Sequence, residues 1–136
     1  MNQALDFLQQ HPDVALATVK DNKPKVRVFR IMKQEGTTLY FATSKNKAVY
    51  RQLVANPNME ILAFEDDIHV RCVGHACFDV DDSTAQWIYS HNEVLSRLYS
   101  DYKAMEYFRM DIQEMDFYDL APTPPLFRYF DLRNQE

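Results

Sequence analysis

Basic side chains gather in one short part of this sequence, where they could hold an anion. Between residues 20 and 51 there are nine lysines or arginines and two acids, a net charge of +7, whereas the rest of the chain carries −12. A chain that is acidic overall is a poor non-specific binder of nucleic acid, and a local basic segment is better suited to a compact anionic ligand. On charge alone, ordinary solvated strand and helix side chains are the simpler interpretation.

The strands expected in this segment place an arginine beside a candidate phosphate site. The residue pattern predicts strands over 26–32 and 37–43, joined by a hairpin at Gly36. Arg27 and Phe29 then point to the same side of the first strand, because side chains alternate along a strand. The planar guanidinium of Arg27 is suited to a two-pronged contact with a phosphate.

A helix start follows the second strand and adds another source of positive charge. Thr43 and Ser44 end that strand, and Ser44 is the expected N-cap of a helix over 45–55. The first turn of a helix presents unpaired N–H groups and the positive end of the helix dipole, which together hold phosphate well. Lys47 falls in this first turn, and Arg51 lies one turn further along the same face. Cations at a helix N-terminus are unfavourable without an anion, so their placement indicates that one binds there.

Several familiar chemistries have no support in the sequence. Two glycines in the whole chain are too few for a glycine-rich phosphate loop, and neither a Gly-x-Ser-x-Gly nor a Cys-x-x-Cys motif is present. His69 and His75 share a strand face, but about 20 Å of extended chain separates them, which is too far for one metal. Acidic clusters at 65–67 and 79–82 lack the oxygen-ligand spacing of a calcium loop. We therefore expect no metal site.

Length and cysteine placement favour one cytoplasmic domain. The 136 residues fit a single domain over 1–136. No apolar run is long enough to span a membrane, and the N-terminus lacks the basic region of a secretory signal. Cys72 and Cys77 point to opposite faces of one strand, so they are expected to be reduced thiols and not a disulfide. These features predict a protein that contacts neither membranes nor nucleic acids.

The remaining pattern predicts a mainly β protein with some α-helices, of the α+β class. Gly74 is a candidate bulge in a long strand. One small barrel has little room inside, so a large cofactor would sit on its surface or between two copies, which favours a homodimer. Besides the elements above, we expect helices over 4–11, 84–91 and 93–110, and strands over 14–19, 59–64, 68–80, 117–120 and 126–132.

An ordered set of motifs resembles the FMN-binding split-barrel superfamily of pyridoxamine 5'-phosphate oxidase. The motifs follow one another across roughly residues 1 to 132, and their order is more specific than any one of them. They are Pro-x-x-Arg at Pro24 and Arg27, the strand end Leu39–Ser44, the helix start Asn46–Leu53 leading to Ala55–Asn58, and Val70–Ala76 with its Gly-x-Ala ending.

This resemblance implies a six-stranded antiparallel split β-barrel that forms a homodimer with two FMN sites at its interface. Residues 27–29 would line the flavin, partly through backbone atoms. The phosphate and ribityl chain would meet Thr43, Ser44, Asn46 and Lys47. A donor near the flavin N1–C2=O edge would stabilise the reduced anion, and Arg27, Arg30 and His69 are all candidates for it. The expected cofactor-binding residues are Arg27, Val28, Phe29, Arg30, Thr43, Ser44, Asn46, Lys47 and His69.

The sequence also departs from the true oxidases of this superfamily. Those enzymes end in a segment with Arg and His that grips the substrate, and no such segment appears around residues 126–133. Lys47-Ala48-Val49 stands where they carry Ser-Arg-Lys. The resemblance therefore implies a short relative of general function, and vitamin B6 oxidation is not expected.

Two functions from different classes remain open. The first is an FMN-dependent oxidoreductase that reduces a small molecule, such as a quinone or nitro compound, with NAD(P)H. The second is a non-catalytic module that holds FMN, haem or another cofactor for storage, sensing or electron transfer. No side chain stands out as a general acid or base, so the sequence names no catalytic residue.

Overall fold

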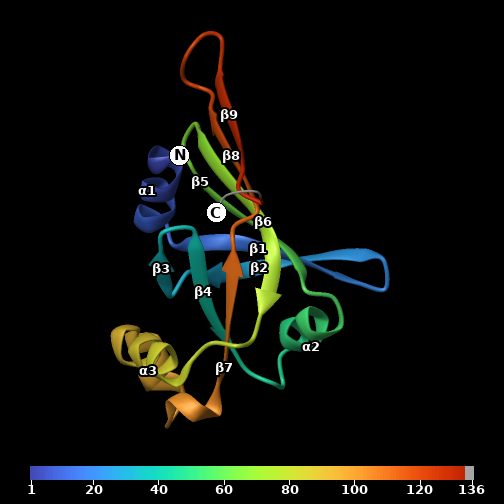
Figure 1. Cartoon of the computed structure of the whole chain (residues 1–136), viewed down its shortest axis with the longest axis vertical. Coiled ribbons are helices and arrows are strands. Elements are labelled where there is room, and N and C mark those ends of the chain that lie inside the picture. Colours follow the sequence, from blue (N-terminus) through green and yellow to red (C-terminus); the bar gives the residue numbers. More distant parts are fainter. Residues whose placement is uncertain (134–136) are drawn as a thin grey trace.

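Antiparallel strands curl into a half-open barrel, as the sequence predicts for a split barrel (Figure 1). The computed structural model describes residues 1–133. Within this range nine strands form the sheet, more than the six that the resemblance implies. The main path runs β2-β1-β5-β6-β7-β4-β3, while β8 pairs with β6 and β9 pairs with β8. The strands are β1 (Asp13–Lys20), β2 (Lys23–Arg30), β3 (Lys33–Glu35), β4 (Thr38–Thr43), β5 (Asn58–Glu65), β6 (Ile68–Cys77), β7 (Glu106–Asp111), β8 (Glu114–Asp119) and β9 (Leu126–Asp131).

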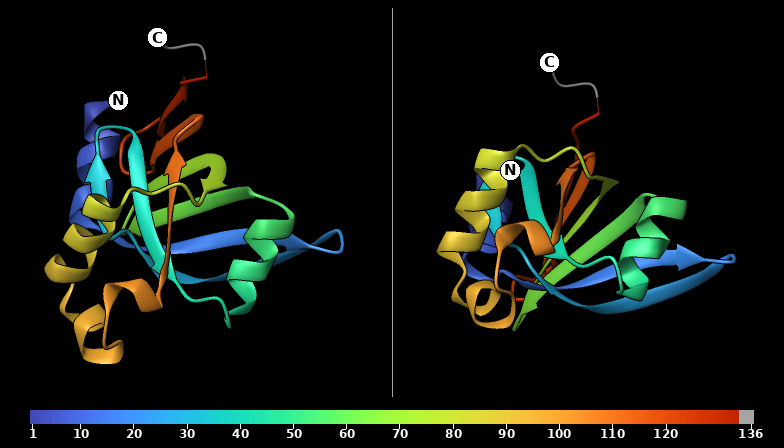
Figure 2. Two further views of the ribbon diagram at one scale, coloured as in Figure 1. Left: turned by 60° about the horizontal axis from the view of Figure 1, so that its bottom comes forward. Right: turned by 90° about the horizontal axis from the view of Figure 1, so that it is seen from below.

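The helices lie on both sides of the hairpin that β1 and β2 form. In both views of Figure 2, α2 lies beside the protruding part of this hairpin, and α3 lies at the other side of the molecule. The N-terminal α1 buries apolar side chains in the barrel core, and α2 packs on β1. No helix within residues 1–133 is long and apolar enough to span a membrane. The helices are α1 (Asn2–Gln10), α2 (Ala48–Ala55), α3 (Asp82–His91), α4 (Glu93–Leu98) and the 3₁₀ turn η1 (Tyr102–Ala104).

A two-residue turn closes the β1–β2 hairpin. Asp21 and Asn22 have φ values of 52° and 63°, a left-handed conformation that Asp and Asn tolerate better than most residues. The turn sets a register in which Leu16 lies opposite Arg27. Because Leu16 is fully buried, Arg27 points to the inner face of the sheet.

The segment between Glu93 and Met110 differs from the prediction. The sequence predicts one helix there, and this is wrong: the structure has α4, then η1, then β7. Strand β7 lies between β4 and β6 and buries Tyr107, Phe108 and Met110. Aromatic side chains suit a strand as well as a helix, and pairing with two neighbouring strands decides between them here.

Gly74 lies where β6 exchanges one partner strand for another. Strand β6 pairs with β8 as far as Val73 and with β7 from Ala76 onward. A Cβ atom on Gly74 would lie 2.5 Å from Met110 Cγ and 2.7 Å from the carbonyl oxygen of Asp111. The pairing with β5 passes through Gly74 without an extra residue, so the predicted bulge is wrong. The close approach of β7 explains the glycine.

Aromatic rings fill the barrel beneath the inner face of β2. The rings of Phe41 and Phe108 are stacked with centroids 5.2 Å apart, and both side chains are fully buried. Phe29 contacts both of them edge-on or tilted, at 6.3 and 6.2 Å. A second apolar cluster, which includes Ile88 and Leu95, joins α3 and α4 to the sheet. The two clusters fix the walls of the space between α2 and α4.

Candidate cofactor site

An open cavity of about 470 Å³ lies between α2 and α4, and we call it the α2–α4 cavity. Strand β2 supplies one part of its lining, β4 and the start of α2 a second part, and α4 the opposite wall. Its volume is within the range of small-molecule sites. Five of the predicted cofactor residues line it: Arg27, Val28, Phe29, Thr43 and Lys47.

Arg27 reaches this cavity while the protein holds its guanidinium in place. Its Nη1 donates to the Thr18 hydroxyl at 2.8 Å and to the Leu16 carbonyl at 3.2 Å, and its Nη2 donates to Gln52 Oε1 at 2.6 Å. The Thr18 hydroxyl also donates to Gln52 Oε1 at 2.6 Å. A guanidinium has five N–H donors, so these contacts leave two of them for a ligand.

The charge of Arg27 has no acidic partner in the described structure. None of the ion pairs within residues 1–133 includes it. Partial burial lowers the pKa of the Arg27 guanidinium from its ordinary value, because the charged form loses solvation. A half-buried cation without a counter-charge is unfavourable, and an anion in the cavity would relieve that cost.

The start of α2 differs from the prediction and remains open to a ligand. The helix begins at Ala48 with Lys47 at the N-cap, so Ser44 is not its cap. Ser44 is buried, and its hydroxyl is taken up by the side chain of Asn46 in the turn before the helix. Within the described residues no side chain caps the first turn of α2, so its N–H groups can receive an anion.

Four predicted cofactor residues do not line the α2–α4 cavity of this single chain: Ser44 and Asn46, in the turn before α2, and Arg30 and His69, on the sheet. Arg30 forms an ion pair with Asp13 at 3.0 Å. His69 lies on β6 between Phe64 and Tyr118, with its ring stacked on that of Tyr118 at 6.2 Å between centroids. Both side chains lie on the outer face of the sheet, opposite to Arg27.

Comparison with known proteins places the chain in a family. The sequence model of that family, described as pyridoxamine 5'-phosphate oxidase, matches residues 1–123. The chain belongs to the pyridoxamine 5'-phosphate oxidase family. A search of curated proteins finds no match.

Solved structures share the fold of this family member at low sequence identity. General stress protein 26 from Bacillus anthracis has a TM-score of 0.77 at 19% identity, covering 95% of this chain and 97% of that one. A family-related FMN binding protein from Nostoc punctiforme has a TM-score of 0.76 at 17% identity, covering 98% and 90%. A haem binding protein from Mycobacterium smegmatis has a TM-score of 0.75 at 15% identity, covering 94% of this chain and 56% of that one.

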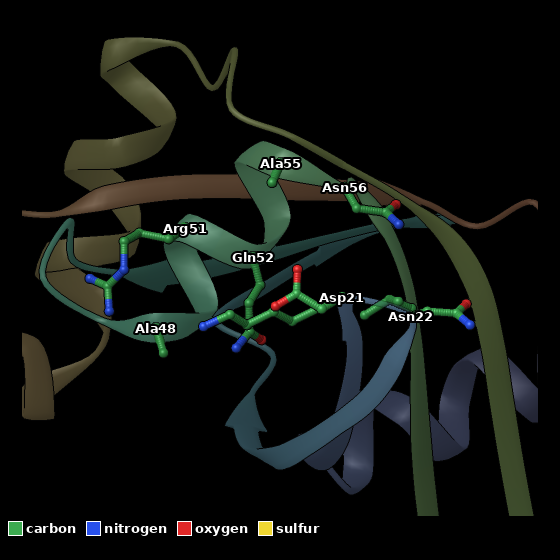
Figure 3. Close-up of a pocket in the computed structure, with 9 residues that line it drawn as sticks. Asp21, Asn22, Ala48, Arg51, Gln52, Ala55 and Asn56 are labelled. Atoms are coloured by element: carbon green, nitrogen blue, oxygen red, sulfur yellow. The ribbon is translucent and has the colours of Figure 1, made fainter.

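A second cavity lies on the other flank of α2, and we call it the flank cavity (Figure 3). It has a volume of about 360 Å³ and lies between α2 and the β1–β2 turn. Arg51 is among the residues that line this cavity, whereas Lys47 is among those that line the α2–α4 cavity. In Figure 3 the side chain of Arg51 points away from Asp21. Gln52 lines the flank cavity while its Oε1 accepts the bond from Arg27.

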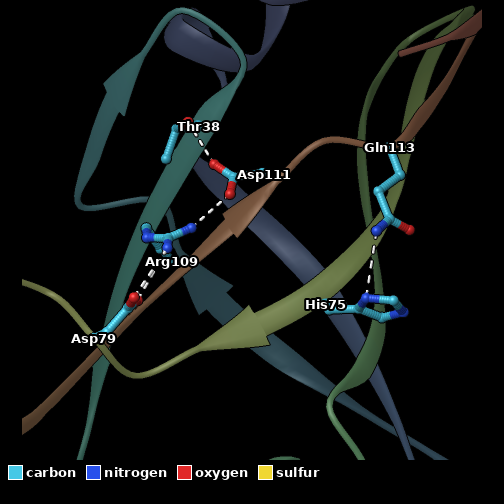
Figure 4. Close-up of polar contacts among 6 residues, drawn as sticks. All are labelled: Thr38, His75, Asp79, Arg109, Asp111 and Gln113. Atoms are coloured by element: carbon cyan, nitrogen blue, oxygen red, sulfur yellow. Dashed lines mark hydrogen bonds and ion pairs between the residues drawn. The ribbon is translucent and has the colours of Figure 1, made fainter. Parts of the chain in front are cut away.

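A polar network at the far end of β7 is structural (Figure 4). Arg109 bridges the carboxylates of Asp111 and Asp79, and the Thr38 hydroxyl donates to Asp111 at 2.7 Å. His75 lies apart from them, with its Nδ1 3.3 Å from the side-chain nitrogen of Gln113. Among residues 1–133, no three His, Cys, Asp or Glu side chains are grouped as a metal site would require.

Sequence reasoning missed two parts of the site in this family member. Gln52 and Thr18 orient Arg27, and the only signal was a polar residue between the apolar Val49 and Leu53 on the buried face of α2. The apolar wall of α4 was missed because the sequence predicts one long helix over 93–110, which does not separate α4 from the segments after it. Both omissions concern groups that lie far from the recognisable motifs in the sequence.

Proposed function

We propose that this chain binds FMN in the α2–α4 cavity, with the FMN phosphate beside Arg27 and the start of α2. The observation that carries the proposal is the half-buried guanidinium of Arg27, which is oriented by Gln52 and lacks an acidic partner within residues 1–133. The FMN binding relative from Nostoc punctiforme, which shares the fold, supports the choice of ligand. FMN, when bound, supplies reversible one- and two-electron transfer.

Four groups of the chain are suited to the phosphate. Arg27 offers its two remaining N–H donors, and Lys47 contributes a second positive charge, which has no ion-pair partner among the described residues. The N–H groups of the first turn of α2 and the hydroxyl of Thr43 complete the donor set. The phosphate would balance both cations, which explains why Lys47 occupies a helix start and why Arg27 lies on the neighbouring strand β2.

The remaining predicted residues have less direct parts in this proposal. Val28 and Phe29 form the β2 edge of the cavity, where backbone atoms can meet the flavin ring. Ser44 and Asn46 shape the turn that presents α2, and we propose them for the ribityl chain. Arg30 and His69 lie outside the cavity of their own chain, so they can contribute only to the cavity of a second copy.

We propose that this second copy covers the outer face of the sheet. Val26, Val28 and Phe64 lie on that face with 70%, 76% and 62% of their surface exposed, an unusual exposure for large apolar side chains. His69 pairs with Phe64 on the same face. A homodimer formed there would bury these side chains and bring His69 toward the open cavity of the partner, which needs a further wall.

We further propose that the bound FMN serves an oxidoreductase that reduces a small electrophile with NAD(P)H. The open mouth of the cavity supports this reading, because a substrate must reach the cofactor from outside. The alternative is a module that holds flavin or haem without turnover. The haem binding protein from Mycobacterium smegmatis, which shares the fold, supports this alternative.

The visible spectrum of the purified protein tests the proposal, together with identification of the released cofactor. A flavin spectrum with FMN released on denaturation is the expected result. A Soret band would support the haem alternative and overturn the choice of FMN. A flavin that is bound but is not reduced by either pyridine nucleotide would support the non-catalytic alternative.

A further inference from the structure

We infer that the α2–α4 cavity takes an uncharged, mainly apolar substrate beside the cofactor, and that α4 makes this selection. The inference rests on the proposed FMN site and adds the class of molecule that is admitted to it. It follows from how charge is distributed along the lining of the cavity and from how firmly α4 is held.

All charged side chains of the lining lie at one end of the cavity. Arg27 and Lys47 stand beside the start of α2, and no other lining residue carries a charge or an imidazole. The opposite wall consists of Val94, Leu95 and Leu98 from α4, followed by Tyr99 and Met105. Once a phosphate balances the two cations, a charged substrate would find no counter-charge among the remaining lining residues of the same chain. Arg30, which a second copy would contribute, is already paired with Asp13, so the cost of desolvating a charged substrate would not be offset.

Helix α4 separates its charges from its apolar face. Val94, Leu95 and Leu98 face the cavity, as the helical spacing of these positions allows. Glu93 and Arg97 are exposed and take no part in the lining. Leu98 has 65% of its surface exposed in the single chain, so it is accessible at the cavity mouth. Contact with an apolar ligand at the cavity mouth gives that side chain a role.

The wall is fixed in place by hydrogen bonds at both of its ends. At the start of α4, Asn92 Nδ2 donates to the carbonyl oxygens of Ile88 at 2.7 Å and Met32 at 3.2 Å. At its end, the Tyr89 hydroxyl donates to the Tyr99 carbonyl at 2.6 Å. These bonds tie α4 to α3 and to the lining residue Met32. The wall is therefore preformed, so it can discriminate between ligands without first having to be ordered.

Two nitroarenes that differ in charge test this selection. We would titrate the FMN-loaded protein, in its oxidised state and without a reductant, with methyl 4-nitrobenzoate and with 4-nitrobenzoate, using calorimetry to obtain each Kd. The neutral ester is expected to bind about tenfold or more tightly than the anion. Equal binding of the two probes, or tighter binding of the anion, would overturn the inference.

Charge changes at Leu98 identify α4 as the selecting element. Leu98→Lys is expected to reduce the ester-to-anion preference about fivefold or more, and Leu98→Glu to increase it. Val54→Lys is the matched control, because Val54 is 59% exposed on α2 and does not line the cavity. A preference that is unchanged in both Leu98 variants, or changed as much by Val54→Lys, would contradict the role of α4.

A separate FMN titration of each variant distinguishes the two proposals. Failure of the wild-type protein to bind FMN would contradict the proposed function itself. Normal FMN binding together with no discrimination between the nitroarenes would contradict only the inference about α4. Because Leu98 is exposed, its variants are expected to fold, and the FMN titration gives the FMN affinity of each variant, so that the nitroarene titrations can be made at full FMN loading.

Discussion

Arg27 Nη2 donates a hydrogen bond of 2.6 Å to the side-chain oxygen of Gln52, which joins the second strand of the sheet to the second turn of α2. The Thr18 hydroxyl donates to the same oxygen, so one amide group fixes both donors. Gln52 is nearly buried, at 9% exposed. The orientation of the guanidinium is therefore set by the protein before any ligand arrives, which is the arrangement expected of a preformed anion site.

Replacement of Gln52 by Leu should separate this anchoring role from simple packing. The buried hydroxyl of Thr18 would lose its acceptor, so we expect a loss of about 1–3 kcal/mol in the free energy of unfolding. FMN affinity should fall as well, because Arg27 would no longer be held. Urea unfolding and an FMN fluorescence titration measure the two effects, and a variant as stable as the wild type would contradict the anchoring role.

Gln52→Glu tests the unpaired charge of Arg27. The carboxylate keeps an acceptor for Arg27 and Thr18, so stability should change less than in Gln52→Leu. It also supplies the counter-charge that Arg27 lacks, so FMN affinity should weaken by about 1–3 kcal/mol. The same FMN titration decides the point, since unchanged or tighter FMN binding would show that the charge of Arg27 is not reserved for the ligand.

Gly74→Ala should be strongly destabilising because β7 leaves no room for a Cβ atom. The added carbon would lie 2.5 Å from Met110 Cγ and 2.7 Å from the backbone oxygen of Asp111. A backbone oxygen cannot relieve such a clash by a change of rotamer. We expect a cost at the upper end of about 1–3 kcal/mol. Gly36→Ala is the control, since its Cβ would meet nothing within 4 Å and only its φ of 57° is strained. Thermal unfolding of both variants should rank Gly74→Ala as the less stable.

The stability of the fold should fall at alkaline pH, in part through Cys72. Burial raises the pKa of this thiol from 9.0 to about 12. Below pH 9 the thiol is protonated in both the folded and the unfolded chain, so the folded state has its full advantage. As the pH rises from 9 toward 12, only the unfolded chain loses the proton, and stability declines. Urea unfolding between pH 8 and 11 should show a shallower decline in Cys72→Ala, and equal slopes would contradict this.

Val28→Glu should disrupt the proposed homodimer. A charge at this exposed position on the outer face of the sheet would have to be buried in the interface, so light scattering should report a smaller mass than for the wild type. Val54→Glu is the control, because Val54 is similarly exposed but belongs to α2. Equal masses for the wild type and Val28→Glu would exclude this face as the interface.

The early part of the fold could be predicted because its sequence signals are local. Runs of apolar residues mark β1 and β5, and Asp21 and Asn22 are residue types typical of a turn. Strand β7 could not be predicted, because its aromatic residues fit a helix equally well and only pairing with β4 and β6 decides their conformation. The bulge predicted at Gly74 is wrong for a similar reason. This glycine is required by the close approach of β7, a strand that is distant in sequence.

In the candidate site, too, the parts with local sequence signals could be predicted and the parts that depend on tertiary contacts could not. Arg27, Thr43 and Lys47 line one cavity, but the hairpin that the sequence predicts between strands 26–32 and 37–43 is wrong. The turn at Gly36 joins β3 to β4, and β2 pairs with β1 instead. The N-cap was placed three residues too early, since Ser44 is a good cap by type but is buried and bonded to Asn46. Gln52 and the α4 wall depend on tertiary contacts, so no local pattern could reveal them.

The most direct test of the FMN site is an equilibrium titration of the protein with FMN, followed by quenching of flavin fluorescence. Arg27→Ala and Lys47→Ala should each lose about 1–3 kcal/mol of FMN binding free energy, because each removes a charge-assisted contact with the phosphate. Arg51→Ala, whose side chain lines the flank cavity instead, should bind FMN as the wild type does. Unchanged FMN binding in both Arg27→Ala and Lys47→Ala would contradict the assignment of the phosphate to the α2–α4 cavity.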